Sequence, residues 1–265
     1  MRLKSIASGS SGNSIYVGTD NAHILVDAGI SGKRIEQGLA ELGITGSDLD
    51  GILITHEHSD HIQGLGVMAR RYGIPIYSTR GTLEEIIRSK SIGNIDTSLL
   101  NELAYDSAYK IKDITFNTIK ISHDAAAPVA YSFEHEGKKA AIITDLGMYD
   151  DYIKAKISGL DAIYLEANHD VRMLQLGRYP YALKKRILGD RGHLSNEAAG
   201  KLLADVLHDD MKYIVLSHLS QENNIPDLAY EAVRLEVTMG QCPYKADDFD
   251  IMVAKRNEPS RTLVV

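Results

Sequence analysis

A dense run of metal-ligand residues directly follows an apolar segment in the first quarter of the chain. Residues 51–61 read Gly-Ile-Leu-Ile-Thr-His-Glu-His-Ser-Asp-His. A short apolar run that ends in polar residues is typical of a buried strand. In an extended loop, side chains two positions apart point to one side, so His56 and His58 can bind one cation. Asp60 and His61 can turn toward a second cation. We therefore predict a metal site immediately behind this strand.

Three more potential ligands also follow apolar, strand-like segments. His123, Asp145 and His218 each come directly after a run of this kind. Rigid strands hold ligands in place, while the loops that follow them leave space for metal, water and substrate. We expect these three side chains to complete the site.

The ligand pattern His-x-His-x-Asp-His, together with the three later residues, resembles the metal-binding signature of the metallo-β-lactamase superfamily. The resemblance implies a site for two divalent ions, zinc by affinity, with manganese or iron as alternatives. Two such ions beside only two carboxylates leave a positive pocket that suits a phosphodiester. The resemblance also implies the ligands of each ion: His56, His58 and His123 on one ion, Asp60, His61 and His218 on the other, and Asp145 bridging both.

Three further stretches are more specific. They are Ser-Gly-Ser-Ser-Gly-Asn-Ser at residues 8–14, Leu-Glu-Ala-Asn-His-Asp at 165–170, and Gly-Asp-Arg-Gly-His-Leu-Ser-Asn at 189–196. Together they resemble the bacterial YycJ (WalJ) family over residues 8–226. The resemblance implies a nuclease, and for this family a 5′-to-3′ exonuclease of double-stranded DNA linked to repair. A small-molecule phosphodiesterase or a thioester hydrolase of the same fold is the alternative, and a non-catalytic metal-binding protein is a third hypothesis.

A basic segment lies between residues 172 and 191. It contains six Lys or Arg side chains and one acid, with Tyr179 and Tyr181 interleaved. Such a segment can follow a nucleic-acid backbone and stack on bases, although it also fits a solvated helix at residues 182–188. The whole chain has 29 basic and 36 acidic residues, a formal charge of −7. Any binding of DNA must therefore be local.

Several other residues are assigned roles around the predicted metals. We expect Ser8 and Asn13 to form a phosphate-binding turn, where an ordinary tight turn is the alternative. Asp27, at the end of a predicted strand, should brace the metal loop from outside. Asn168 and Arg191 are expected to contact substrate.

Two residues are expected to move protons. Asp60 should orient the attacking water and accept its proton, and His193 should protonate the leaving alkoxide. His169 lies in a neighbouring motif, and the division of roles between His169 and His193 stays open.

We predict one α/β domain over residues 1–265, an αββα four-layer arrangement of two mixed sheets, with a basic helical insertion at about residues 169–195. This length and composition fit a single large core. Predicted strands cover residues 2–7, 14–18, 23–27, 51–54, 74–77, 111–121, 129–134, 139–144, 162–165 and 213–216. Predicted helices cover residues 33–42, 63–72, 83–88, 150–156, 182–188, 195–207 and 226–239.

The chain carries no sign of a membrane or an oxidising environment. Its single cysteine, Cys242, rules out internal disulfides, and no apolar stretch approaches 18 residues. We expect a soluble cytoplasmic protein with DNA as its partner, without contact to membranes, and make no prediction of protein partners.

Overall fold

The structure, a computed structural model, describes all residues 1–265 and contains fourteen strands and nine α-helices. The strands are β1 (Arg2–Ala7), β2 (Ser14–Gly18), β3 (His23–Val26), β4 (Gly51–Leu53), β5 (Ile76–Thr79), β6 (Leu100–Leu103), β7 (Ala108–Ile111), β8 (Ile114–Lys120), β9 (Val129–His135), β10 (Lys138–Ile143), β11 (Ala162–Glu166), β12 (Tyr213–Ser217), β13 (Asp250–Val253) and β14 (Leu263–Val264). The helices are α1 (Gly32–Ala40), α2 (Ser59–Ile62), α3 (Leu65–Tyr72), α4 (Arg80–Arg88), α5 (Asp151–Ile157), α6 (Val171–Leu176), α7 (Tyr181–Ile187), α8 (Asn196–Val206) and α9 (Pro226–Met239).

The strands form two mixed sheets of seven strands each. Their strand orders are β14-β1-β2-β3-β4-β5-β6 and β13-β12-β11-β10-β9-β8-β7. In the first sheet β14 to β3 pair antiparallel and β3 to β6 run parallel. In the second, β7 to β9 pair antiparallel and β10 to β13 run parallel.

The chain divides into two compact units. The first comprises residues 1–120, 125–136 and 255–264, and the second comprises residues 121–124, 137–254 and 265. No helix in either unit combines the length and the apolar content needed to cross a bilayer.

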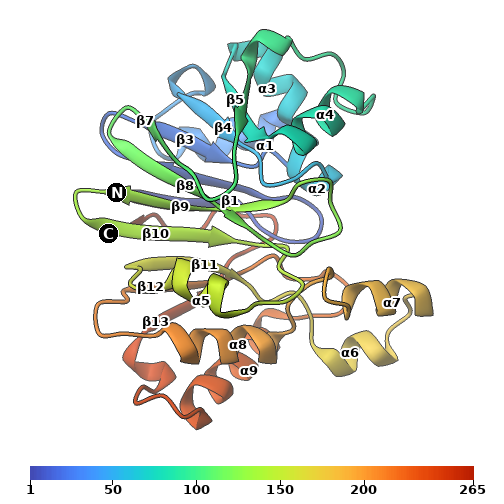
Figure 1. The fold of residues 1–265 in the computed structure, drawn as a ribbon, viewed down its shortest axis with the longest axis vertical. Coiled ribbons are helices and arrows are strands. Elements are labelled where there is room, and N and C mark those ends of the chain that lie inside the picture. The colour runs from blue at the N-terminus through green and yellow to red at the C-terminus, as the bar shows by residue number, and fades with distance from the viewer. The chain divides into compact units, whose positions relative to one another are not determined.

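In the first unit, α1, α3 and α4 cover one face of the first sheet (Figure 1). Ile35, Met68 and Ile86 come from one helix each and are buried against Leu25 and Ile52 of the sheet. Each has a second buried apolar residue three or four positions away in its own helix (Leu39, Leu65 and Leu83), so each helix turns one apolar stripe inward. Each such side chain contributes on the order of 2 kcal/mol through burial.

The opposite face of the first sheet packs against β8 and β9 within the same unit. The ring centres of Tyr77 and Phe116 lie 6.3 Å apart, and those of Phe116 and Tyr131 lie 6.2 Å apart. The Tyr131 hydroxyl donates a 2.8 Å hydrogen bond to the carbonyl of Ile54, directly before the predicted metal loop. The predicted layering of helices, sheet and second sheet is therefore present in this unit.

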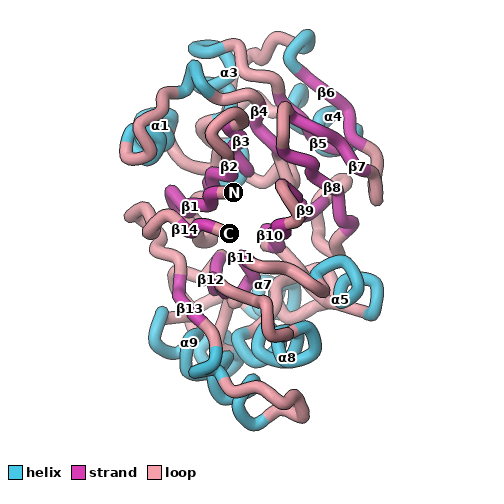
Figure 2. The backbone as a smooth tube through the Cα atoms, turned by 90° about the vertical axis from the view of Figure 1, so that its left-hand side faces the viewer, coloured by secondary structure: helices cyan, strands magenta, loops and turns pink.

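The second unit is built on the parallel strands β10 to β13. Ile142, Leu165 and Val215 are fully or almost fully buried, as expected for strands covered on both faces. α8 packs against α5 and α9, and α9 contacts β13 (Figure 2). α8 begins at the predicted place because Ser195 Oγ accepts a hydrogen bond from the amide of Ala198.

The prediction of one strand at residues 111–121 is wrong. Lys112 has a φ of +51°, so the chain turns there, and β7 and β8 form a hairpin on either side. Two consecutive polar residues, Lys112 and Asp113, interrupt the alternating apolar pattern at this turn, and the predicted strand runs across that interruption. Five short elements of two to six residues are not predicted by the sequence pattern: α2, α6, β6, β13 and β14.

Candidate functional site

In the first unit, Asp27 supports the loop that carries the predicted ligands. Its backbone leaves β3 with a φ of +59°, a left-handed conformation that Asp tolerates better than most residues. The buried carboxylate accepts hydrogen bonds from the Thr55 amide at 2.9 Å and from the Thr55 hydroxyl at 2.9 Å. It also lies 2.7 Å from His61 Nδ1. The bond fixes the ring so that Nε2 is left for another partner.

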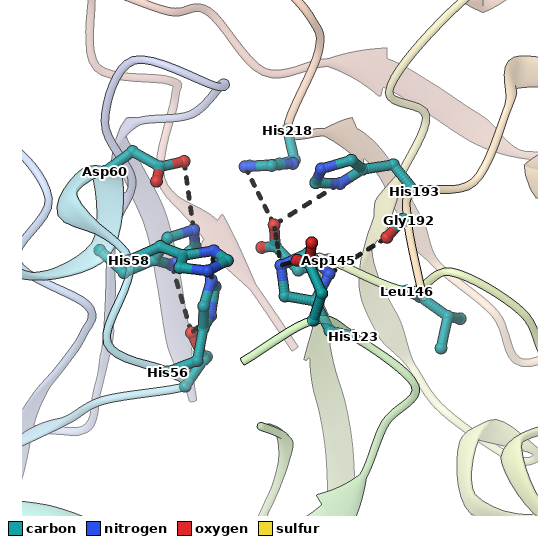
Figure 3. Close-up of polar contacts among 12 residues, drawn as sticks. His56, His58, Asp60, His123, Asp145, Leu146, Gly192, His193 and His218 are labelled. Carbon is teal, nitrogen blue, oxygen red and sulfur yellow. Dashed lines mark hydrogen bonds and ion pairs between the residues drawn. The ribbon is translucent and has the colours of Figure 1, made fainter. Parts of the chain in front are cut away.

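Four predicted ligands of this loop lie close together. His56 Nε2 and His58 Nδ1 are 3.1 Å apart (Figure 3). His61 Nε2 is 3.4 Å from Asp60 Oδ2. Two donors bound at about 2.1 Å to one tetrahedral ion lie roughly 3.4 Å apart, so both pairs have the spacing of shared ligands. The donor set therefore fits divalent metal binding.

The loop at residues 8–14 folds onto the metal loop of the same unit. Asn13 donates its backbone N–H to the Asp60 carbonyl at 2.8 Å, and its side-chain oxygen accepts the Gly9 amide at 2.9 Å. Ser8 and Asn13 are buried, with Ser8 donating its amide to Lys255. A Cβ on Gly29 would lie 1.6 Å from the Asp60 carbonyl oxygen, so the approach of the two loops requires glycine.

A polar cavity of about 370 Å³ opens beside this junction. Its lining includes Ser10 and Ser11, from the middle of the glycine-rich loop. The predicted phosphate-binding residues of this loop are Ser8 and Asn13 instead. The exposure of Ser10 and Ser11 in the loop tip is the signal that separates them from the two buried residues. The lining residues are Ser10, Ser11, Ser59, Asp60, Gln63 and Ser91.

In the second unit, Asp145 lies at the centre of the predicted ligands. It follows β10, His218 follows β12, and both have left-handed backbones with φ of +58° and +57°. Asp145 Oδ1 is 3.6 Å from His123 Nε2 and 3.5 Å from His218 Nε2 (Figure 3). These separations again match ligands of a common cation.

Glu166 is a buried carboxylate whose role the sequence analysis did not identify. At the end of β11 it lies 2.9 Å from His193 Nδ1 and 2.8 Å from His218 Nδ1. It also accepts the backbone amides of Leu146 at 2.8 Å and Leu194 at 3.1 Å. Burial raises the carboxyl pKa, but the neighbouring His193 and His218 and these hydrogen bonds bring the pKa of Glu166 down to about 2. Glu166 is therefore an anion that holds both imidazoles.

His193 has its ring beside Asp145 and His218. Its Nδ1 lies 3.6 Å from Asp145 Oδ1, and its ring centre is 5.4 Å from that of His218. Burial lowers the pKa of His193, but the charge and hydrogen bond of Glu166 outweigh it, so the net pKa is raised above the ordinary value. The side chain is suited to carry a proton near neutral pH.

The predicted substrate residues Asn168 and Arg191 support the ligand loops. Asn168 Nδ2 donates to the His218 carbonyl at 2.9 Å. The Arg191 guanidinium donates two bonds, of 3.1 and 3.0 Å, to the His123 carbonyl. Both therefore act on the backbone of metal-ligand candidates, and Arg191 remains on the exposed side.

His169 differs from His193 in its surroundings. The residue is 1% exposed, and neither ring nitrogen has a hydrogen-bond partner. Burial lowers the pKa of His169 to about 4, so its ring is neutral. Its carbonyl accepts the Asn196 amide at 2.9 Å. The structure thus gives His169 a buried place in the backbone frame that holds residues 194–196.

Sequence comparisons agree with the resemblance. A family profile described as a beta-lactamase superfamily domain matches residues 22–218. Exodeoxyribonuclease YycJ of Bacillus anthracis is 46% identical over 228 residues, which cover 86% of this chain and 86% of that protein. Exodeoxyribonuclease WalJ of Streptococcus pneumoniae is 44% identical over 225 residues, covering 85% and 84%.

Solved structures show the same fold at low sequence identity. The metallo-beta-lactamase fold protein YhfI from Bacillus subtilis matches 98% of this chain and 99% of its own, with a TM-score of 0.70 and 14% identity. Human tRNase Z, short form, matches 100% of both chains with a TM-score of 0.67 and 15% identity. The predicted fold class, two mixed sheets flanked by helices, is confirmed.

Proposed function

Because the chain belongs to the beta-lactamase superfamily, and within it to the family of the exodeoxyribonucleases YycJ and WalJ, we propose that it is a metal-dependent exodeoxyribonuclease. One observation carries the chemistry. Around the carboxylate of Asp145, the second unit holds ligand nitrogens of His123 and His218 together with the protonatable ring of His193. Donors for a metal and a donor of a proton are thus neighbours, as hydrolysis of a phosphodiester requires.

The proposed ligands are those of the family pattern. The donor pairs within each unit, 3.1 to 3.6 Å apart, support this assignment. When bound, two divalent ions supply Lewis acidity, lower the pKa of a water and balance charge on the phosphate. Zinc suits the histidine-rich set first, with manganese and iron as alternatives. The set is His56, His58 and His123 for one ion, Asp60, His61 and His218 for the other, and Asp145 for both.

The protein's own side chains then divide the proton transfers. Asp60 is positioned by its backbone bond to Asn13, and we assign it the orientation of the attacking water and the acceptance of its proton. His193 keeps the proton on Nδ1 because that N–H donates a hydrogen bond to the Glu166 carboxylate. The proton on Nε2 is therefore the one given to the leaving alkoxide. Asp27 holds His61 in the same way.

Contacts to the substrate backbone belong to two loop systems. Ser8 and Asn13 shape the turn whose N–H groups would meet a phosphate, and Asn168 and Arg191 hold the ligand loops that border it. The proposal also includes duplex DNA as the substrate, digestion in the 5′-to-3′ direction and a link to repair. We further propose a cytoplasmic location, without contact to membranes. They rest on the resemblance to the YycJ family.

Incubation of the purified protein with end-labelled DNA tests the function. Duplex DNA, single-stranded DNA, RNA and bis(p-nitrophenyl) phosphate are each compared with Zn²⁺, Mn²⁺ and Mg²⁺. Progressive shortening of DNA from one end is the expected result. Turnover of the small ester with intact DNA would instead establish a small-molecule phosphodiesterase.

A further inference from the structure

A groove on the basic insertion has no role in the chemistry above. It has a volume of about 580 Å³ and lies along α7 and the end of α6. We propose that it binds an unpaired nucleotide at the end of the DNA, with the base stacked on Tyr181 and the phosphates beside Lys184 and Lys185. This inference rests on the proposed function. The groove is lined by Gln175, Tyr181, Lys184, Lys185, Leu188 and Gly189.

Large apolar side chains in and beside the groove are exposed. Tyr181 is 82% exposed, Leu176 is 88% exposed, and Leu188 is 45% exposed. Large apolar side chains that cluster on an exposed surface mark a place for a partner. The Tyr181 ring has no hydrogen bond and no neighbouring ring, and it extends from the first residue of α7. An open aromatic face is the feature that proteins use to stack bases without regard to sequence.

The segment that carries the groove is strongly basic. Residues 172–191 carry six basic side chains and one acidic one, a formal charge of +5, which leaves −12 for the rest of the chain. Lys185, Arg172 and Arg178 form no salt bridge, so their charges are not neutralised by the protein. Lys184 Nζ donates to the Gln175 carbonyl at 2.7 Å, across the groove, and thereby faces it. A polyanion is the partner that complements this surface.

The groove is attached to the ligand loops of the same unit. The His193 amide donates to the Ile187 carbonyl at 3.0 Å, directly at the end of α7. Arg186 pairs with Asp124, which follows His123, through a 2.9 Å bond from NH2 to Oδ1. The insertion is therefore fastened to two site loops. A strand held on Tyr181 would lie at a fixed place relative to His193.

Stacking also selects the state of the DNA. Bases inside a duplex already stack on both sides, and a terminal base is still held by its pairing partner, so an unpaired base is the one that can leave the stack and enter the groove beside Tyr181. The groove should therefore prefer a frayed or overhanging end to a blunt one. An exonuclease that takes single nucleotides from a duplex needs this separation of the strands.

A fluorescent base tests the contact directly. Metal-loaded protein is titrated with a duplex that ends in a short overhang containing 2-aminopurine, with phosphorothioate linkages to slow hydrolysis. Stacking should quench the 2-aminopurine. Tyr181→Ala should remove the quenching and weaken binding of the overhang roughly 10-fold, whereas Tyr181→Phe should preserve both. Tyr152→Ala is the matched control, because Tyr152 is a tyrosine of the same unit with Lys156 beside its ring, outside the groove.

Salt dependence tests the charge. Lys185→Gln should make the slope of log binding constant against log salt concentration less negative by about 0.7 to 1, and Lys156→Gln should leave the slope unchanged. Folding of each variant is verified by circular dichroism, and its chemistry by turnover of bis(p-nitrophenyl) phosphate, which is too small to need the groove.

The outcomes separate the two proposals. If Tyr181→Ala quenches 2-aminopurine and binds the overhang like the wild type while the small ester and DNA are hydrolysed, the groove inference is wrong and the exonuclease stands. The same holds if the variant loses only binding to phosphatidylglycerol vesicles, since the groove would then serve a membrane surface. A wild type that hydrolyses neither DNA nor ester would overturn the proposed function itself.

Discussion

The buried ring of His169 should make the folded protein sensitive to mild acid. Its pKa is lowered from 6.5 to about 4 in the fold, chiefly by burial. Between these values the unfolded chain binds a proton that the folded chain does not bind. The free energy of unfolding is therefore highest above pH 6.5, where His169 is neutral in both states, and it decreases as the pH falls toward 4. A difference of this size corresponds to about 3 kcal/mol in all, and to about 2 kcal/mol between pH 7 and pH 5.

Substitution His169→Phe isolates this contribution. Neither ring nitrogen of His169 has a partner, so an apolar ring removes no hydrogen bond and should change the unfolding free energy at pH 7 by roughly 1 kcal/mol or less. At pH 5 the variant should have gained about 2 kcal/mol relative to the wild type. Urea unfolding at pH 7, 6 and 5, followed by circular dichroism, measures both proteins.

Metal release is the main competing cause of acid sensitivity. Both proteins are therefore also measured in EDTA, where no metal remains to be released. If the stabilities of wild type and His169→Phe fall in parallel from pH 7 to pH 5 in EDTA, desolvation of His169 does not control the acid response.

Three substitutions and the removal of metal test the site further. Asp60→Ala should reduce hydrolysis of phosphodiesters far more than 10-fold with an unchanged circular dichroism spectrum, and a variant that keeps both its metal and most of its turnover would disprove the role of Asp60. Glu166→Gln removes the anion that orients His193 and His218, so kcat or metal affinity should fall roughly 10- to 100-fold. Metal analysis and kinetics measure this, and values within twofold of wild type would contradict it. Gly29→Ala places a methyl group on the Asp60 carbonyl and should destabilise the first unit by at least about 2 kcal/mol in urea unfolding. An unchanged midpoint would show that the two loops separate readily. Removal of metal with EDTA should abolish hydrolysis and lower Tm, and added Zn²⁺ or Mn²⁺ should restore both. Activity that persists in protein shown by metal analysis to be free of metal would contradict a metal-dependent mechanism.

The sequence revealed the metal-ligand candidates because each follows an apolar strand. His123, Asp145 and His218 are visible in this way without knowledge of the fold, since strand and polar residue are adjacent in the chain. Glu166 also ends an apolar strand, yet its importance depends on partners distant in the sequence, at His193 and His218. An acid at a strand end between two ligand-bearing strands is the signal that should have indicated it.

Burial explains why other expectations needed the structure. Ser8 and Asn13 belong to the same glycine-rich loop as Ser10 and Ser11, and composition alone does not reveal which of these residues face inward. Asn168 likewise looks like a polar loop residue until its amide is seen to bind the His218 carbonyl. Short elements such as α6 are set by tertiary contacts and by the cap from Asp170, because six residues hold little intrinsic helix stability.

The left-handed backbones of Asp27, Asp145 and His218 lower the stability of the folded protein. Each non-glycine residue in that conformation costs on the order of 1 kcal/mol, which glycine would recover. Glycine at Asp145 or His218 would relieve this strain but remove a proposed ligand, and glycine at Asp27 would leave the amide of Thr55 and the ring of His61 without their buried partner. Variants intended for use at high temperature therefore need their stabilising changes at other positions, or selection in the presence of metal, whose binding favours the original side chains.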